Sequence, residues 1–147
     1  MHAYSSPRDV GNILGITRTE KSFTGLDLDT AVRAGLPAAT VERVARLVSP
    51  DSIKIRYNLV AKATMARRLK TAGQRLSPEE SDRVVRLARL WRMSLDCWKT
   101  DIEARAFLER KHALLNGRTP LEVATGSDVG SREVEQILGR LMFGVAA

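Results

Sequence analysis

Basic residues are concentrated in one part of the chain, between Ser52 and Pro78, where there is no aspartate or glutamate. The basic residues of this segment are Lys54, Arg56, Lys62, Arg67, Arg68, Lys70 and Arg75. The whole chain has 24 lysines and arginines against 17 acidic residues, so these seven equal its entire excess of +7. Positive charge gathered in one place is typical of proteins that bind a polyanion, usually nucleic acid. A solvated basic face that only aids solubility is the alternative.

The second half of this segment predicts a basic helix that contacts DNA. Residues 61–72 are rich in alanine and arginine, which favour helix, and Gly73 supplies a stop. Two short helices with a tight connection, the second of them basic, are the layout of a helix-turn-helix, although many helical hairpins share it. We expect the basic side chains to contact phosphates or bases, and a threonine near the helix start to contact backbone or base. These predicted DNA-binding residues are Lys62, Thr64, Arg67, Arg68 and Lys70.

The residue types and spacings that enzymes use are not found. The sequence has neither a glycine-rich phosphate loop followed by Lys and Ser/Thr nor an HExxH metal pair. Glu79 and Glu80 are adjacent, so on a helix they point about 100° apart and do not converge on one substrate atom. With one cysteine and two histidines, no zinc site is expected. We therefore predict a protein that is not an enzyme, with no catalytic residue, metal or cofactor.

The composition also predicts a cytoplasmic protein with no membrane partner. No apolar run approaches the roughly 20 residues that cross a bilayer. The N-terminus, MHAYSSPRDV, lacks the basic-then-apolar pattern of a signal peptide. The single cysteine, Cys97, cannot form an internal disulfide, which agrees with a reducing compartment.

The elements that must position these residues are predicted to be helices throughout. Three helix starts carry a hydroxyl residue with glutamate three positions later, the capping box, at residues 77–80, 100–103 and 119–122. Apolar residues at helical spacing follow the first box as far as Trp98, and recur in a last helix that starts near Ser131. The apolar stripe of that last helix is Val134, Ile137, Leu138, Leu141 and Met142, all expected in the core.

The N-terminal third is less regular. Residues 1–28 show no sustained hydrophobic period, so we predict a flexible arm or one that is ordered by a partner. Asp29 can cap a short helix that ends near Gly35. Residues 52–59, SIKIRYNL, alternate apolar and polar side chains like a strand. A helix is favoured there because Ser49, followed by proline, forms a helix-start signal just upstream.

Three blocks in the second half of the chain resemble one family domain. They are LSPEESDRVVRLARL at residues 76–90, GRTPLEVA at 117–124 and VGSREVEQILGRLMFGV at 129–145. In this order and at this spacing they resemble the toxin-binding domain of the Xre/MbcA/ParS antitoxins. Upstream, AGLP at 34–37 and TMARRLK at 64–70 are similar to the helix-turn-helix part of the same antitoxins.

The resemblance covers the chain from about Asp29 onward and, together with the irregular arm of residues 1–28, predicts an all-α fold with three parts. After the arm come a helix-turn-helix-like DNA-binding region of residues 29–76 and a toxin-binding domain of residues 77–147 packed with it. The resemblance implies an antitoxin of a type II toxin–antitoxin system. The partner toxin would have a RES domain and consume NAD, by degrading it or by transferring ADP-ribose to a host protein. Such antitoxins obstruct the active site of the toxin, dimerise within the complex, and bind operator DNA to repress their own promoter. A helix-turn-helix transcription factor with a C-terminal dimerisation or ligand domain is the alternative.

The end of the chain is the predicted toxin contact. Phe143 lies beyond the last full turn of the apolar stripe, so the core need not hold it. Gly144 allows the backbone to bend, and the small residues after it fit a narrow opening. An aromatic anchor at the centre of an interface can carry much of the binding energy. For Arg140, plain solvent exposure is the alternative. The predicted toxin-binding residues are Arg132, Arg140, Phe143, Gly144, Val145, Ala146 and Ala147.

Overall fold

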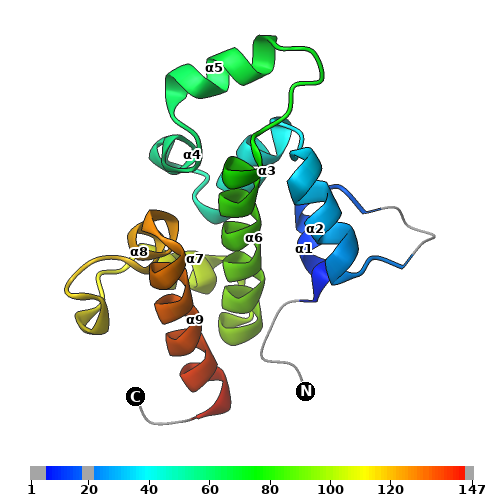
Figure 1. The fold of residues 1–147 in the computed structure, drawn as a ribbon. Coiled ribbons are helices and arrows are strands. Elements are labelled where there is room, and N and C mark those ends of the chain that lie inside the picture. The colour runs from blue at the N-terminus through cyan, green and yellow to red at the C-terminus, as the bar shows by residue number, and fades with distance from the viewer. Residues whose placement is uncertain (1–5, 18–21, 145–147) are drawn as a thin grey trace. The chain divides into compact units, whose positions relative to one another are not determined.

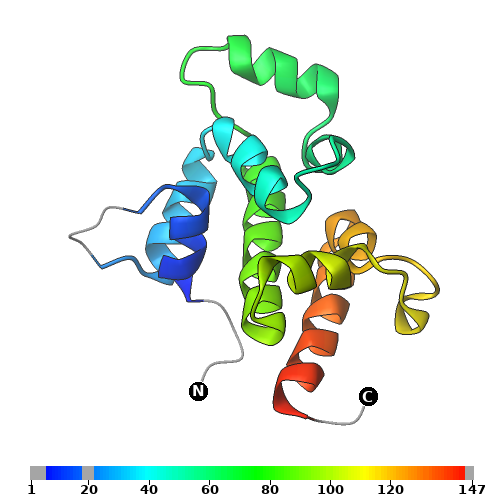
Figure 2. The same ribbon diagram turned by 180° about the vertical axis from the view of Figure 1, so that it is seen from behind.

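The computed structural model describes residues 6–17 and 22–144, and every regular element within these ranges is a helix, as Figure 1 and the reverse view in Figure 2 show. The elements are α1 (Pro7–Leu14), α2 (Gly25–Ala34), α3 (Ala39–Val48), α4 (Lys54–Leu59), α5 (Lys62–Lys70), α6 (Pro78–Trp98), α7 (Asp101–Glu109), the 3-10 helix η1 (Ala113–Leu115), α8 (Pro120–Gly126) and α9 (Asp128–Phe143). The predicted all-α fold is confirmed. In the described ranges no helix has the length and apolar character needed to span a bilayer.

The chain divides into two compact units, residues 6–88 and, within the described part, residues 89–144. Helix α6 begins in the first unit and ends in the second. Its first turns bind the first unit, because the backbone N–H of Leu36 donates to Ser81 Oγ at 2.8 Å and Arg83 donates to the carbonyl of Leu59 at 2.6 Å. The division therefore falls inside α6, later than the boundary at residues 76 and 77 that the sequence motifs suggested.

Helix α1 corrects the predicted N-terminal arm. Ser6 caps this helix by accepting a hydrogen bond from the N–H of Asp9 at 3.1 Å, and Pro7 occupies its first position. Val10 and Leu14 are each only 2% exposed, and α1 contacts α3. Packing of an apolar face stabilises a helix that is too short to form by itself. Residues 6–14 are therefore part of the first unit.

The described remainder of the predicted arm also leads into a helix. The hydroxyl of Thr24 accepts from the N–H of Asp27 at 3.3 Å, and the Asp27 carboxylate accepts from the N–H of Thr24 at 2.7 Å. These reciprocal bonds are the capping box that begins α2. Residues 1–5 and 18–21 of the predicted arm lie outside the described residues.

Residues 52–59, whose pattern suggested either a strand or a helix, contain helix α4. Ile55 and Leu59, four positions apart, are buried, whereas Ile53 is 66% exposed. The helical period therefore decides which side chains enter the core. The predicted cap at Ser49 is wrong, because this residue ends α3, and α4 begins only at Lys54.

The three predicted capping boxes begin α6, α7 and α8. The hydroxyls of Ser77, Thr100 and Thr119 accept from the N–H three residues later at 3.1, 3.2 and 3.1 Å. At Ser77 the reciprocal bond is present too, because Oε1 of Glu80 accepts from the N–H of Ser77 at 2.8 Å. These caps are local in sequence, which is why spacing alone could find them.

Helix α9 is capped by Ser127 and begins at Asp128, three residues before the predicted start. Its buried residues are Ser131, Val134, Ile137 and Leu138. The expectation that Leu141 belongs to the core is wrong, because this side chain is 48% exposed. Figures 1 and 2 show that the last turns of α9 run on beyond α8, which packs against its first turns at Gly130.

The crossing of α8 and α9 is unusually close. A Cβ atom on Gly130 would lie 2.2 Å from the carbonyl oxygen of Val123. Side chains do not tolerate such a distance, so only glycine fits here without moving one helix. This close approach fixes how α9 lies against α8 within the second unit.

Candidate functional site

Helix α5 carries the predicted DNA-binding residues. None of its side chains is buried, and those of Lys62, Arg67 and Lys70 are exposed. Thr64 is half-buried on the first turn. The Nζ of Lys62 lies 6.0 Å from the ring centre of Tyr57, at the outer limit of a cation–π contact. Three cations of α5 therefore face solvent, where a phosphate backbone can reach them.

Arg68 is placed differently from the other cations of α5. Its Nε donates to Oε1 of Glu80 at 3.0 Å, and its Nη2 donates to Oε2 at 3.4 Å. The exposed fractions of the two side chains are 27% and 10%. The guanidinium of Arg68 is thus paired with a carboxylate on α6. It differs in this from the exposed cations of α5, which are Lys62, Arg67 and Lys70 and are called the open cations below.

Two more basic residues of the acid-free segment have partners within the first unit. Arg56 donates from Nε and Nη2 to the carboxylate of Glu42 at 2.6 and 2.9 Å. Arg75 donates to the carbonyl of Gly35 at 2.8 Å. Counting charge along the sequence missed these pairings, because both acceptors, the Glu42 carboxylate and the Gly35 carbonyl, lie outside the segment. Within residues 52–78, all of which the structure describes, the exposed lysines and arginines that pair with neither a carboxylate nor a backbone carbonyl are Lys54, Lys62, Arg67 and Lys70.

Glu80 has an unusual electrostatic position for a carboxylate. Burial raises its pKa, but hydrogen bonds from the N–H of Ser77 and from the guanidinium of Arg68, together with the charge of Arg68, outweigh burial. They hold the pKa of Glu80 below its ordinary value of 4.5. The side chain is therefore ionised at neutral pH while it caps α6 and binds α5.

The end of α9 is open to solvent, as the sequence predicted for Phe143. Phe143 is 52% exposed, Arg140 is exposed, and Gly144 ends the helix in a left-handed conformation with φ of +65°. A hollow of about 450 Å³ lies beside this end, and its lining residues are Asp96, Cys97, Lys99, Leu141, Met142 and Phe143. Sequence analysis missed Asp96 and Lys99 as neighbours of the tail, because no local pattern links the end of α6 to the end of α9. Val145, Ala146 and Ala147 lie outside the described residues.

Arg132 is not brought together with the rest of the predicted toxin contact. It lies on the first turns of α9, where its Nε pairs with Asp128 at 3.0 Å. Eight residues of helix separate it from Arg140, which is about 12 Å along the axis. Contact of both arginines with one partner therefore requires a surface that extends along α9.

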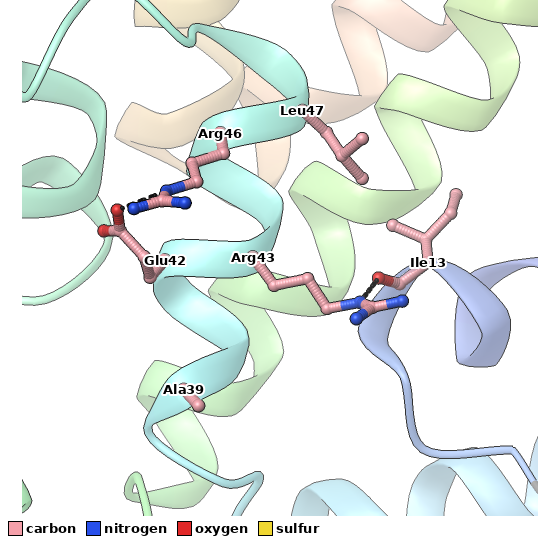
Figure 3. A pocket seen from close by; sticks show the side chains of 6 residues that line it. All are labelled: Ile13, Ala39, Glu42, Arg43, Arg46 and Leu47. Carbon is pink, nitrogen blue, oxygen red and sulfur yellow. Dashed lines mark hydrogen bonds and ion pairs between the residues drawn. The ribbon is translucent and has the colours of Figure 1, made fainter.

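A second hollow, of about 590 Å³, lies between α1 and α3 in the first unit (Figure 3). Its lining residues are Ile13, Ala39, Glu42, Arg43, Arg46 and Leu47. Arg43 donates to the carbonyl of Ile13 at 2.8 Å, and Arg46 pairs with Glu42 at 2.9 Å. The sequence did not indicate this hollow, because it did not predict α1. We assign it no ligand, because these three charged side chains already bind one another or the backbone.

Two family comparisons cover most of the chain. Residues 27–89, which run from within α2 to within α6, match the antitoxin Xre-like helix-turn-helix domain. Residues 96–144 match the antitoxin Xre/MbcA/ParS C-terminal toxin-binding domain. No curated protein matches the chain. The exposed cations of α5 thus lie in the first domain, and the open end of α9 lies in the second.

Both matched domains are binding modules of a regulator. The second match names toxin binding as the role of the C-terminal domain, so it favours an antitoxin over a transcription factor with a ligand domain. The order of the two domains is the one that the sequence motifs predicted. The chain belongs to the Xre/MbcA/ParS family of antitoxins, with a helix-turn-helix domain followed by a toxin-binding domain.

Proposed function

We propose that this antitoxin neutralises a RES-domain toxin that consumes NAD, and that the end of α9 covers the entrance to the active site of that toxin. The observation that carries the proposal is the exposure of Leu141 and Phe143, 48% and 52%, within the toxin-binding domain. Covering large apolar side chains that are half exposed to water lowers the free energy, so it favours binding of a partner. Neighbouring turns of α9 are buried, so this end is presented on a fixed support.

The charges around the open end suit an entrance that admits a phosphate-bearing substrate. Arg140 and Phe143 are three residues apart, so they lie on the same face of α9. Lys99 lines the hollow beside them, and the one acidic residue of its lining, Asp96, is paired with Arg92. We include Gly144, Val145, Ala146 and Ala147 in the contact because they continue from this face. The proposal is therefore an apolar anchor flanked by cations.

Phe143→Ala tests the anchor without shortening the helix. Loss of an anchor at an interface centre costs roughly 2 kcal/mol, so the concentration of antitoxin that halves NAD consumption should rise more than tenfold. NAD consumption is measured with the purified product of the neighbouring toxin gene, titrated with each antitoxin variant. Truncation after Met142 should reduce inhibition at least as much.

Ile102→Ala is the matched control, because Ile102 is a large apolar residue of the same domain that is 79% exposed on α7. It should inhibit like the unchanged protein. Circular dichroism shows whether each variant keeps its helices. If folded Phe143→Ala inhibits as well as Ile102→Ala, the helical face of the domain must block the toxin instead. If the neighbouring gene product consumes no NAD, the proposed class of toxin is wrong.

The proposal also gives the antitoxin a second activity, repression of its own promoter as a homodimer within the toxin complex. Its support is the set of open cations on α5, in the domain that matches a helix-turn-helix. We expect Lys62, Arg67 and Lys70 to contact phosphates and Thr64 to contact backbone or base. Each lost phosphate contact lowers the slope of log affinity against log salt by roughly 0.9. Gel shifts of Arg67→Ala over a salt series, on DNA from upstream of its own gene, test this.

A further inference from the structure

Helix α5 lacks the usual means of holding a DNA-contacting helix in place. None of its nine residues is buried. Both views show it standing apart from α3, which forms part of the core of the same unit (Figure 1, Figure 2). Hydrophobic packing therefore fixes its orientation only weakly. Something else must hold its cations in a defined geometry.

The Arg68–Glu80 ion pair is the contact that fits this role. It is two-pronged, with Nε to Oε1 at 3.0 Å and Nη2 to Oε2 at 3.4 Å. This geometry fixes direction as well as distance. The same Oε1 accepts from the N–H of Ser77 at 2.8 Å, so the carboxylate is itself held at the start of α6. A fixed acceptor at the start of α6 can orient a helix that has no buried residue of its own.

Electrostatics gives a second reason to assign Arg68 to Glu80 and not to DNA. If Arg68 left Glu80 to bind a phosphate, a buried carboxylate would lose its counter-charge next to a polyanion. Breaking a pair of this kind by removing one partner is costly because the remaining charge has no compensation. The open cations Lys62, Arg67 and Lys70 can bind phosphates without this cost.

We propose that Glu80 and Arg68 are positioning residues for DNA binding: their ion pair orients α5 so that Lys62, Arg67 and Lys70 reach the phosphate backbone, and neither of the two contacts DNA. The inference rests on the promoter binding proposed above. It predicts an unusual direction for the change in DNA affinity when a negative charge is removed. Removal of a negative charge near DNA should by itself strengthen binding, whereas removal of the Glu80 charge should weaken it.

Glu80→Gln is the substitution that isolates the ion pair. Glutamine can replace glutamate in a capping box, so the cap on α6 is retained while the charge is lost. Glu79→Gln is the matched control, because Glu79 is exposed on the same first turn of α6 and carries the same charge. Both variants raise the net charge by one. Only Glu80→Gln removes the partner of Arg68.

Binding is measured by gel shift over a salt series, with a labelled duplex from upstream of the gene for this chain. We expect Glu80→Gln and Arg68→Ala each to weaken binding about fivefold to tenfold without lowering the salt slope, and Glu79→Gln to bind at least as tightly as the unchanged protein. The double variant should be no weaker than either single variant, because both remove the same pair. Arg67→Ala should lower the slope by roughly 0.9.

Hydrogen exchange supplies a readout that does not need DNA. The amides of α5 should exchange faster in Glu80→Gln than in Glu79→Gln, and toxin inhibition should be the same in both. Equal DNA affinity for these two variants would overturn the positioning role while leaving promoter binding intact. A slope lowered by roughly 0.9 in Arg68→Ala would also overturn it, because Arg68 would then contact a phosphate. Failure of the unchanged protein to bind the duplex would instead refute the proposed promoter binding, and the positioning role with it.

Discussion

Helices α9 and α5 each carry one of the two candidate interfaces, but they are held in different ways. Helix α9 buries Ser131, Val134, Ile137 and Leu138 in the core of its own unit. Helix α5 has no fully buried residue, and an ion pair between Arg68 and Glu80 joins it to α6. The proposed toxin contact is therefore supported by packing, whereas the proposed DNA contact is supported mainly by charge.

This difference decides what can disturb each interface. Packing depends on shape, so changes of side-chain volume disturb α9. A partly exposed ion pair depends on protonation and, to a lesser degree, on salt, so changes of charge disturb α5. Elements with few buried contacts are also those that open first within a native structure. We therefore expect α5 to be the less stable of the two helices.

The same substitution on both helices should give the largest contrast. Leu138 is fully buried on α9, whereas Leu69 on α5 is 46% exposed. Leu138→Ala leaves a cavity and should lower the free energy of unfolding by about 3 kcal/mol. Leu69→Ala should lower it by no more than about 0.5 kcal/mol. Urea unfolding followed by circular dichroism measures both, and similar losses would mean that α5 is packed after all.

Gly130→Ala should give the next largest effect, about 2 kcal/mol of destabilisation, because its Cβ would meet the carbonyl of Val123. The unfolding of this unit can be followed by fluorescence, since Trp91 and Trp98 both belong to it. Gly139→Ala is the control: it lies on the same helix with open space around it, and alanine there should stabilise the unit slightly. Destabilisation by both variants would point to an effect of alanine itself and not of the crossing.

What the sequence could predict follows from the range of the interactions involved. The caps at Ser77, Thr100 and Thr119 join residues three positions apart, and the apolar stripe of α9 needs only helical spacing. The Arg68–Glu80 pair joins residues twelve positions apart across a loop. No periodic pattern marks such a contact, so the charge count treated Arg68 as open.

Helix α1 was missed for a different reason, since a local signal was present. Ser6, Pro7 and Asp9 have the same cap, first-position and third-position roles as Ser77, Pro78 and Glu80. The helix has only eight residues, too few for a hydrophobic period to stand out. The exposure of Leu141 could not be read from spacing either, because a stripe does not show where the covering elements end.

Ser77→Ala tests whether the cap or the ion pair matters more for the first unit. Loss of an N-cap hydroxyl costs about 1 kcal/mol, which circular dichroism during urea unfolding can detect. The Glu80 carboxylate keeps Arg68 and the N–H of Ser77 as partners in this variant. DNA affinity should therefore change less than in Glu80→Gln. A larger loss of affinity in Ser77→Ala would mean that the start of α6, and not the ion pair, orients α5.

Acid should give the smallest effect on stability, and it should act on the first unit. Burial raises the pKa of both Glu42 and Glu80, but their hydrogen bonds and charged arginine partners outweigh it and leave each pKa below 4.5. A carboxylate whose pKa is lower in the folded than in the unfolded chain stabilises the fold above its unfolded pKa. That stabilisation is lost as the pH falls from 4.5 through the folded pKa.

The two units can be followed separately in this experiment, because both tryptophans report on the second. As the pH falls below 4.5, the free energy of unfolding should decrease more in circular dichroism, which sees both units, than in tryptophan fluorescence. Glu80→Gln should be less stable than the unchanged protein at neutral pH and should lose less of its stability in acid, because it has no carboxylate at that position to protonate. Leu138 is apolar and fully buried, so protonation does not remove its packing, and the core contacts of α9 should persist at a pH where the Arg68–Glu80 pair is lost. An equal acid sensitivity of Glu80→Gln and the unchanged protein would show that the ion pair contributes nothing to folding, and would separate its role in stability from its role in orienting α5.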